Sequence, residues 1–191
     1  MNNQSTIEKM KQMRLYAMAD NHYNSLQSNL HRDYTTDQYI ALLVEQEWEH
    51  RYNKRIKNLI ASAGFRYPAS VQDVDYSANR SLDKNTFERL AMLDFIKRGE
   101  NVIITGATGT GKSYLAQALG HNACVMQHKT LYYNFARLID QVKLSKLEGT
   151  YMKLLKKIDN TDLIILDDFG LSAFDYHARN TLMDIVEMKY D

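Results

Sequence analysis

The chain has 191 residues, a formal net charge of +1 and a single cysteine, Cys124. These values imply no overall attraction to polyanions, exclude an internal disulfide and, with histidines at no mutual ligand spacing, make a zinc site improbable. No run of 18 apolar residues occurs and no signal-peptide pattern is present, so we expect a cytoplasmic protein without a membrane-spanning helix.

The first third of the chain has the periodicity of helices. A first helix is predicted from Ser5 onward, and a long second helix from about residue 35 to Ala63. Trp48 and Tyr52 lie on the apolar ladder of the second helix, so we predict that they belong to a core rather than to an exposed stacking platform. The ladder repeats at i, i+4 and comprises Ile40, Val44, Trp48, Tyr52, Ile56 and Ile60, backed by Leu43 and Leu59.

A basic run overlaps the end of this second helix. Residues 51–72 contain five basic side chains and no acid. Such a stripe could follow a phosphate backbone, but it could equally be a solvated face in which Glu47 pairs with Arg51 or Lys54. The candidate DNA-contacting residues are Arg51, Lys54, Arg55 and Lys57, and a second ambiguous lysine cluster comprises Lys143, Lys146, Lys153, Lys156 and Lys157.

The predicted domain boundary lies where the helical pattern stops. Gly64 is expected to end the long helix, and Pro68, the only proline, follows in a polar stretch that runs to about Asp83. We therefore predict a small all-helical domain over residues 1–66, for binding DNA or a partner, and a second domain over residues 67–191.

The second domain has the alternating pattern of an α/β fold. After a helix over residues 82–98, three apolar strands at 102–105, 130–134 and 163–166 alternate with helices. The predicted helices cover residues 112–126, 136–144, 151–157 and 174–189. This alternation predicts a parallel sheet with helices on both faces.

Residues 106–113 read Gly-Ala-Thr-Gly-Thr-Gly-Lys-Ser, a complete G-x-x-x-x-G-K-[ST] phosphate-binding loop between a predicted strand and a predicted helix. Its backbone N–H groups are expected to cradle nucleotide phosphates, with Lys112 on the terminal phosphates and Ser113 on Mg²⁺. The predicted nucleotide-binding residues are Gly106, Ala107, Thr108, Gly109, Thr110, Gly111, Lys112, Ser113 and Tyr114.

A second half of the site is predicted where the third strand ends. Leu163 to Leu166 form an apolar run followed by Asp167 and Asp168, at the carboxyl end where α/β sheets hold their ligands. We expect Asp167 to hold Mg²⁺ and Asp168 to polarise the attacking water, although Asp168 could instead cap the next turn. Asp168-Phe169-Gly170 spells the kinase triplet D-F-G, but no H-R-D-type catalytic loop accompanies it.

These motifs resemble the IstB-like ATPases, transposition helper proteins of bacterial insertion sequences, which are AAA+ proteins close to the helicase loaders of the DnaC type. The resemblance rests on residues 106–121, 163–170, 45–51 and 73–76. It implies an AAA+ P-loop ATPase core that uses ATP and Mg²⁺, assembles as a homo-oligomer on double-stranded DNA and engages a transposase. It also implies catalytic roles for Lys112 and Asp168 and metal-binding roles for Ser113 and Asp167.

One departure from the family concerns the C-terminal side. The resemblance leads us to expect a fourth and fifth strand, a sensor, an arginine finger and a helical lid, none of which follows within these 191 residues. We therefore expect the front part of a longer protein or a truncated product, with slow hydrolysis of ATP.

Three alternative functions stay open at this point. The nearest is a helicase loader with the same ATPase core. The others are a P-loop small-molecule kinase, which the adjacent Asp167 and Asp168 and the basic helical region disfavour, and an interaction module that binds ATP without turnover.

Overall fold

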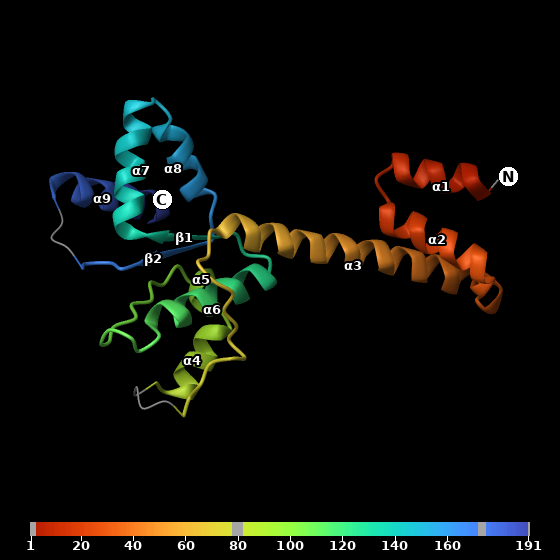
Figure 1. The fold of residues 1–191 in the computed structure, drawn as a ribbon, viewed down its shortest axis with the longest axis horizontal. Coiled ribbons are helices and arrows are strands. Elements are labelled where there is room, and N and C mark those ends of the chain that lie inside the picture. The colour runs from red at the N-terminus through yellow and green to blue at the C-terminus, as the bar shows by residue number, and fades with distance from the viewer. Residues whose placement is uncertain (1–2, 78–81, 172–174, 191) are drawn as a thin grey trace. The chain divides into compact units, whose positions relative to one another are not determined.

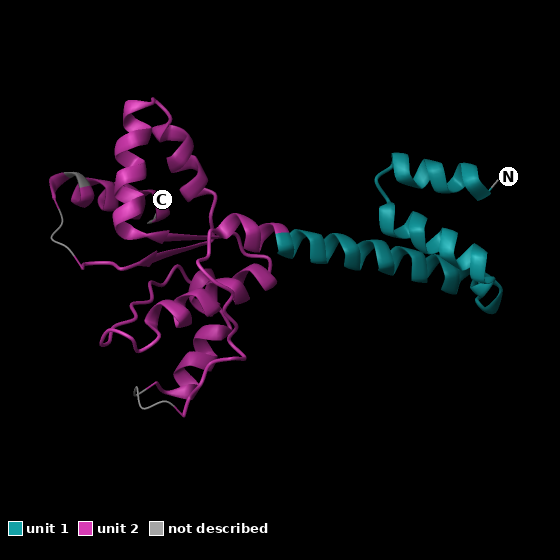
Figure 2. Ribbon diagram, viewed as in Figure 1, with its two compact units in different colours: residues 1–57 teal, residues 58–191 magenta. Residues whose placement is uncertain are grey.

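The computed structural model describes residues 3–77, 82–171 and 175–190. The chain divides into two compact units, residues 1–57 and 58–191 (Figure 2). Residues 58–66 belong to the second unit in this division, and the domain boundary inferred after Arg66 stays a prediction. No described helix is both long enough and apolar enough to cross a membrane.

The first unit is helical. It contains α1 (Asn3–Gln12), α2 (Tyr16–Ser28), the short 3-10 helix η1 (Leu30–Asp33) and most of α3 (Thr36–Ala63), which continues into the second unit (Figure 1). Ile7, Ala19 and Leu43 are its buried apolar side chains among the described residues. As predicted, the long helix stops before Gly64, whose φ of 78° is the left-handed conformation that glycine adopts without strain.

The predicted buried face of α3 is wrong over the first half of the ladder. Ile40, Val44 and Trp48 are 54%, 51% and 58% exposed, whereas Leu43 and Glu47 are 6% and 5% exposed. Successive residues of an α-helix are about 100° apart around its axis, so the buried side of α3 is the row that lies one position before the apolar ladder. Polar contacts select this row, because Glu47 accepts a hydrogen bond from the Met18 amide at 3.1 Å.

The exposed Trp48 packs against the partly buried Tyr52 of the same helix instead. The rings of Trp48 and Tyr52 are stacked with centroids 5.1 Å apart and an interplanar angle of 22°. The expectation that Trp48 lies in a core is therefore wrong, because its side chain is exposed on the surface of the first unit.

The second unit is an α/β structure, as the alternation of elements predicted. The two strands among its described residues, β1 (Thr130–Asn134) and β2 (Leu163–Asp167), are parallel, with Thr130 opposite Leu163 and Asn134 opposite Asp167. Helices lie on both sides of the strands (Figure 1). They are α4 (Lys84–Ala91), α5 (Asp94–Lys97) and α6 (Lys112–Val125) on one side and α7 (Phe135–Leu147), α8 (Tyr151–Asp159) and α9 (Tyr176–Tyr190) on the other.

Each helical layer has its own apolar core. On the α6 side the buried cluster comprises Ala69, Val74, Phe87, Leu115, Ala118 and Leu119. On the α7 side it comprises Leu138, Val142, Leu154, Ile158 and Ile185. The α7-side cluster packs against Tyr133, Ile164 and Leu166 of the strands, and Leu163 packs against a further cluster of Leu93, Phe95 and Ala123. The predicted start of the last helix at Phe174 lies outside the described residues.

The strand predicted at residues 102–105 does not form. This segment pairs with neither β1 nor β2, and Ile103 is 85% exposed. Its β-branched composition suits a strand, but a strand also needs a neighbour to bond its backbone N–H and C=O groups, and no described strand supplies one.

The single helix predicted at residues 82–98 is interrupted. It divides into α4 and α5 at Leu93, which has a φ of 62° and is 1% exposed. Leu93 packs with Phe95 and Ala123, so burial of its side chain accompanies a backbone conformation that is unfavourable for a leucine.

Candidate nucleotide-binding site

The phosphate-binding loop turns into α6 through glycines. Gly109 and Gly111 have φ values of 80° and 84°, which are left-handed conformations, and Gly111 directly precedes the first residue of α6. The Lys112 ammonium donates a hydrogen bond to the Ala107 carbonyl at 2.7 Å, and Thr110 donates to the same oxygen at 2.9 Å. The lysine thus lies over its own loop, at the N-terminus of a 14-residue helix that favours anions.

Asp167 meets this loop at the end of β2. Ser113 Oγ donates to Asp167 Oδ1 at 2.8 Å, and the Asp168 amide donates to the same oxygen at 3.0 Å. Tyr132 Oη donates to the other carboxylate oxygen at 2.6 Å. The structure therefore brings together Ser113 and Asp167, the two residues that the sequence singled out for Mg²⁺ and that lie 54 positions apart.

The hydrogen bonds around Asp167 keep it ionised. Burial raises the pKa of its carboxyl, but the hydrogen bonds from Tyr132, Ser113 and the Asp168 amide, with the positive charge of Arg66, outweigh burial and hold that pKa below its ordinary value. Burial likewise raises the pKa of the Tyr132 phenol, as do the hydrogen bond to Asp167 and its charge, so Tyr132 remains a donor.

This donor set fits Mg²⁺. The described residues contain no cluster of three or more His, Cys, Asp or Glu side chains that could enclose a metal ion. Mg²⁺ is usually held by one or two carboxylates together with substrate phosphates and waters, so a protein cage is not required. Asp167 and Ser113 provide two hard oxygen atoms beside the phosphate-binding loop, which is the contribution that such a site needs from the protein.

The Asp168 side chain is hydrogen-bonded to an asparagine. Asp168 is exposed, has a φ of 56° and accepts a hydrogen bond from Asn134 Nδ2 at 2.7 Å. Asn134 also caps α7 by accepting from the Arg137 amide at 3.2 Å. Asp168 thus lies beside Asp167 at the site, and one of its carboxylate oxygens is engaged by Asn134 at the end of β1.

Tyr114, the last of the predicted nucleotide-binding residues, points its side chain elsewhere. Its ring stacks with that of Tyr67, with centroids 6.3 Å apart and an interplanar angle of 13°. Its hydroxyl accepts a hydrogen bond from the Ser70 amide at 3.3 Å. The Tyr114 side chain therefore fixes the segment that follows α3 onto α6, and its contact with nucleotide stays a prediction.

Sequence reasoning missed several residues of this site. Tyr132 and Asn134 lie two positions apart on β1, so both project on the same face toward the end of β2. Their position at the carboxyl end of a predicted strand was a usable signal, because parallel strands present their ligands there. Arg66 and Gln117 carry no such local signal, and Arg66 was grouped with the basic run.

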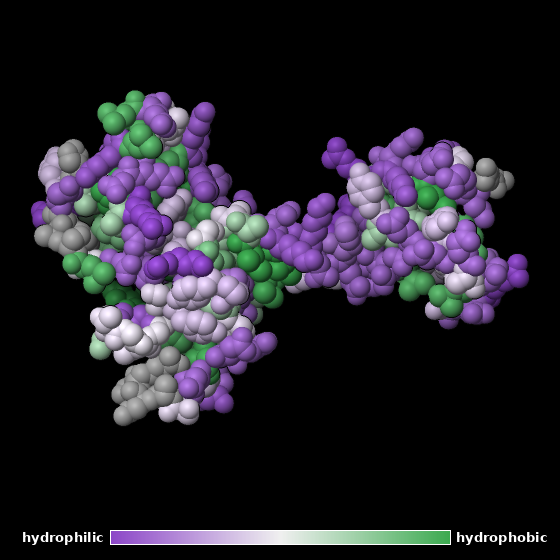
Figure 3. All heavy atoms as spheres, viewed as in Figure 1, coloured by the Kyte–Doolittle hydropathy of each residue, from purple (hydrophilic) through white to green (hydrophobic). Residues whose placement is uncertain are grey.

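The four candidate DNA-contacting residues all lie in the first unit and have different surroundings. Arg51 Nε donates to Glu47 Oε1 at 2.7 Å and Arg51 Nη2 donates to the Arg14 carbonyl at 3.1 Å, so Arg51 ties α3 to the turn after α1. The other three are exposed on α3, and Figure 3 shows hydrophilic side chains over this part of the helix. They are Lys54, Arg55 and Lys57.

The second lysine cluster is divided by the structure. Lys143 pairs with Asp175 at 3.4 Å, and Lys146 lies over the Tyr151 ring at 4.5 Å from its centroid. The remaining members line a cavity of about 390 Å³ at the start of β1, together with Lys129 and several polar residues. These members are Lys153, Lys156 and Lys157. This cavity lies at the amino ends of the strands, opposite the phosphate-binding loop.

Comparison with known proteins agrees with this geometry. The model of the family of IstB-like ATP-binding proteins matches residues 8–191. A predicted insertion sequence ATP-binding protein of Sinorhizobium fredii, y4pL, is 34% identical over 185 residues, which are 97% of this chain and 76% of that protein. The corresponding predicted protein of insertion sequence IS1162 from Pseudomonas fluorescens is 32% identical over 96% of this chain and 80% of its own length.

A more distant relative belongs to the insertion sequence IS21. This predicted ATP-binding protein of Pseudomonas aeruginosa is 25% identical over 154 residues, which are 81% of this chain and 58% of that protein. The family match covers nearly the whole chain, and it includes both the phosphate-binding loop and the strand that ends at Asp167. The chain therefore belongs to the family of IstB-like ATP-binding proteins, as its motifs predicted.

Proposed function

We propose that this protein binds and hydrolyses Mg·ATP and acts as a helper of DNA transposition that assembles on double-stranded DNA and engages a transposase. The observation that carries the nucleotide part is the hydrogen bond between Ser113 and Asp167, 2.8 Å long, beside a complete phosphate-binding loop. It joins the two oxygen ligands that Mg·ATP requires from the protein at the N-terminus of α6.

The roles of the residues follow from their placement. The Lys112 ammonium, now on the Ala107 carbonyl, exchanges that neutral acceptor for phosphate oxygens, which bear a larger negative charge. Bound Mg²⁺ would supply neutralisation of charge that develops on the phosphates. Asp168 accepts the proton of the attacking water on the carboxylate oxygen that Asn134 does not bind, while the bond from Asn134 orients the carboxylate.

The proposal that this protein binds DNA rests on its exposed basic side chains and on its similarity to ATP-binding proteins of insertion sequences. Three exposed basic side chains on α3 (Lys54, Arg55 and Lys57) and the lysine-lined cavity at the start of β1 offer two surfaces for phosphates. The relatives are named as ATP-binding proteins of insertion sequences, which supports a role in transposition. The proposals of a transposase partner and of a homo-oligomer rest on membership of this family alone.

The test of the nucleotide site compares wild type with two variants. Lys112→Ala should abolish tight ATP binding, because removal of the ammonium leaves phosphate charge uncompensated. Asp168→Asn should bind ATP as wild type does but hydrolyse it more slowly, because an amide cannot accept the proton of the water. Affinity is measured by titration with ATP, and turnover by phosphate release with and without duplex DNA.

Either half of the assignment can fail separately. Equal ATP affinity in Lys112→Ala and wild type would overturn the location of the nucleotide site. Undiminished phosphate release by Asp168→Asn would remove the catalytic role of Asp168. A phosphorylated small-molecule product would contradict a helper ATPase and favour a P-loop kinase.

A further inference from the structure

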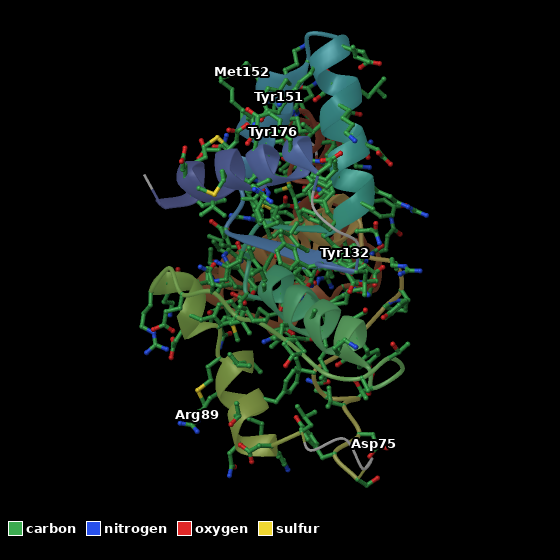
Figure 4. All side chains as sticks on the ribbon, turned by 90° about the vertical axis from the view of Figure 1, so that its left-hand side faces the viewer. Asp75, Arg89, Tyr132, Tyr151, Met152 and Tyr176 are labelled. Atoms are coloured by element: carbon green, nitrogen blue, oxygen red, sulfur yellow. The ribbon has the colours of Figure 1, made fainter. Side chains whose placement is uncertain are left out.

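The carboxylate of Asp167 is held by a tyrosine that none of the sequence motifs includes. Tyr132 lies opposite Ile165 in the register of the two strands, two positions before Asp167. Its phenol spans this offset and donates to Asp167 Oδ2 at 2.6 Å, while Ser113 and the Asp168 amide bind the other oxygen. Figure 4 shows Tyr132 at the level of the strands, above α6. Each carboxylate oxygen therefore has its own donor, which fixes the plane of the group.

A second residue, Arg66, interacts with this tyrosine. The Arg66 guanidinium interacts with the Tyr132 hydroxyl and with the negative charges of Asp167 and Asp168. Its backbone is fixed independently, because the Arg66 amide donates to Gln117 Oε1 at 2.7 Å. Gln117 is fully buried in α6, and its Nε2 donates to the Ser113 carbonyl at 3.2 Å. The Arg66 side chain therefore interacts with Tyr132 and Asp167 at the strands. The Arg66 backbone is linked through Gln117 to Ser113 at the start of α6.

The neighbouring residues hold Arg66 in this place. The Phe65 ring stacks on His121 with centroids 4.2 Å apart and an interplanar angle of 24°. Phe65 can approach α6 this closely because Gly120 has no Cβ, and a Cβ there would lie 2.8 Å from the Phe65 ring. Gly64, with its left-handed φ of 78°, turns the chain out of α3 immediately before. Residues 65–67, shortly after α3, are therefore packed on the helix that follows the phosphate-binding loop.

An orienting donor behind a metal-holding carboxylate affects the affinity for the metal. Such partners fix the direction of the ligand lone pairs, and their removal typically costs about 10- to 100-fold in metal affinity. Without its phenol donor, Asp167 Oδ2 would be free to rotate away from the loop, and Ser113 would have to be reoriented with it. Nucleotide phosphates would still reach Lys112 and the loop amides, which do not depend on Tyr132.

We propose that Tyr132, backed by Arg66, positions the Asp167 carboxylate for Mg²⁺ and so sets the Mg²⁺ concentration at which this protein binds nucleotide tightly. This inference rests on the proposed nucleotide site and adds two positioning residues to it. Because Arg66 follows α3 by three residues, the same pair connects the end of α3 with the metal-holding carboxylate.

The experiment measures binding rather than turnover. A fluorescent ADP analogue labelled on the ribose is titrated into the 191-residue protein, first with EDTA and then at increasing Mg²⁺. Tyr132→Phe removes only the hydroxyl and should raise the half-saturating Mg²⁺ concentration about tenfold, as expected for such partners. Its affinity for the analogue in EDTA should equal that of wild type, which also shows that the variant is folded.

The neighbouring tyrosine provides the matched control. Tyr133 is on the same strand but packs on the α7 side, and its buried hydroxyl has no hydrogen-bond partner among the described residues. Tyr133→Phe should therefore leave the Mg²⁺ curve unchanged. A Tyr132→Phe curve that overlies the wild-type curve would overturn the positioning role while leaving the nucleotide site intact. A wild-type chain that binds no nucleotide in either condition would overturn the proposed function and this inference together.

The role of the Arg66 positive charge is tested with two substitutions. Arg66→Ala keeps the backbone bond to Gln117 but removes the guanidinium, so it should shift the Mg²⁺ curve in the same direction as Tyr132→Phe. Arg66→Lys should restore most of the wild-type curve, because it returns a positive charge beside Tyr132. A wild-type curve for Arg66→Ala would overturn the part assigned to Arg66.

Discussion

At the scale of single residues, the site is built from hydrogen bonds that leave each charged group a defined task. Asp167 has a donor on both oxygens, Asp168 is bonded to Asn134, and Lys112 lies on a carbonyl of its own loop. Only the bond of Lys112 to the Ala107 carbonyl must break for the proposed reaction. In the proposed reaction, this division separates groups that keep the site in shape from the group that would bind the phosphates.

His121 is the residue whose titration should be visible in stability. Burial lowers the pKa of His121 below its ordinary value of 6.5, the hydrogen bond to the Tyr67 backbone acts in the opposite direction, and its Nε2 is buried without a partner among the described residues. The unfolded chain therefore binds the proton more readily than the folded chain once the pH falls below 6.5. Folding stability should be fully present above this pH and decrease as the pH falls toward the lowered pKa.

The measurement is urea unfolding between about pH 8 and pH 5 for wild type and His121→Gln, a range that spans the ordinary histidine pKa. His22, whose pKa is also lowered by burial and by the charge of His31, titrates in both proteins and so cancels in the comparison. The stability difference between the two proteins should shift in favour of the variant as the pH decreases. A difference that is independent of pH would contradict the burial of a neutral His121.

At the scale of elements, the packing of α6 on β2 depends on the absence of one side chain. A Cβ on Gly120 would lie 2.6 Å from Ile165 Cδ1, closer than real contacts allow. Gly120→Ala should therefore lower the free energy of unfolding by about 1 to 3 kcal/mol, the usual cost of overpacking a core. Denaturant unfolding of the variant measures this decrease directly.

A second substitution identifies the cause. Ile165→Val deletes the Cδ1 atom that the new Cβ would meet, so the double variant should be destabilised by less than the sum of the two single variants. Strict additivity would show that contact with Ile165 does not set the cost, which would then come from the Phe65 ring 2.8 Å from the new Cβ.

At the scale of the whole molecule, the proposal requires binding to duplex DNA. Lys54, Arg55 and Lys57 are exposed on α3 and suit phosphates, whereas Arg51 is committed to Glu47 and to the Arg14 carbonyl. Replacing the three exposed residues with alanine should weaken binding to all duplex sequences alike. The slope of log K against log salt should flatten by about 0.9 for each phosphate that the variant no longer neutralises.

The control removes charge from another helix of the same unit. Lys9→Ala with Lys11→Ala on α1 should leave the salt slope nearly unchanged, and ATP affinity should be unaffected in both sets of variants. Parallel salt titrations for wild type and the α3 variant would show that this basic run is only a solvated face. Arg51→Ala is unsuitable for this test, because it leaves the buried Glu47 carboxylate without its cation.

The sequence by itself determined the features that depend on local chemistry. The phosphate-binding loop, the helix that follows it, the end of α3 before Gly64 and the α/β alternation were all predicted. Each follows from backbone torsions that glycine permits or from the periodicity of apolar residues, and both are properties of consecutive residues. The family was recognised for the same reason, since its motifs are contiguous.

Only the tertiary structure decided which faces and pairs are realised. In the first half of α3, the row of Leu43 and Glu47 is buried and the row of the apolar ladder is exposed. The hydrogen bond from the Met18 amide to Glu47 competes with apolar burial and favours this arrangement. Residues 102–105 have the composition of a strand, but strand formation requires a partner that a local pattern does not reveal. Tyr132 and Arg66 meet Asp167 from distant segments of the chain, a convergence set by the parallel register and the packing of residues 64–67 on α6.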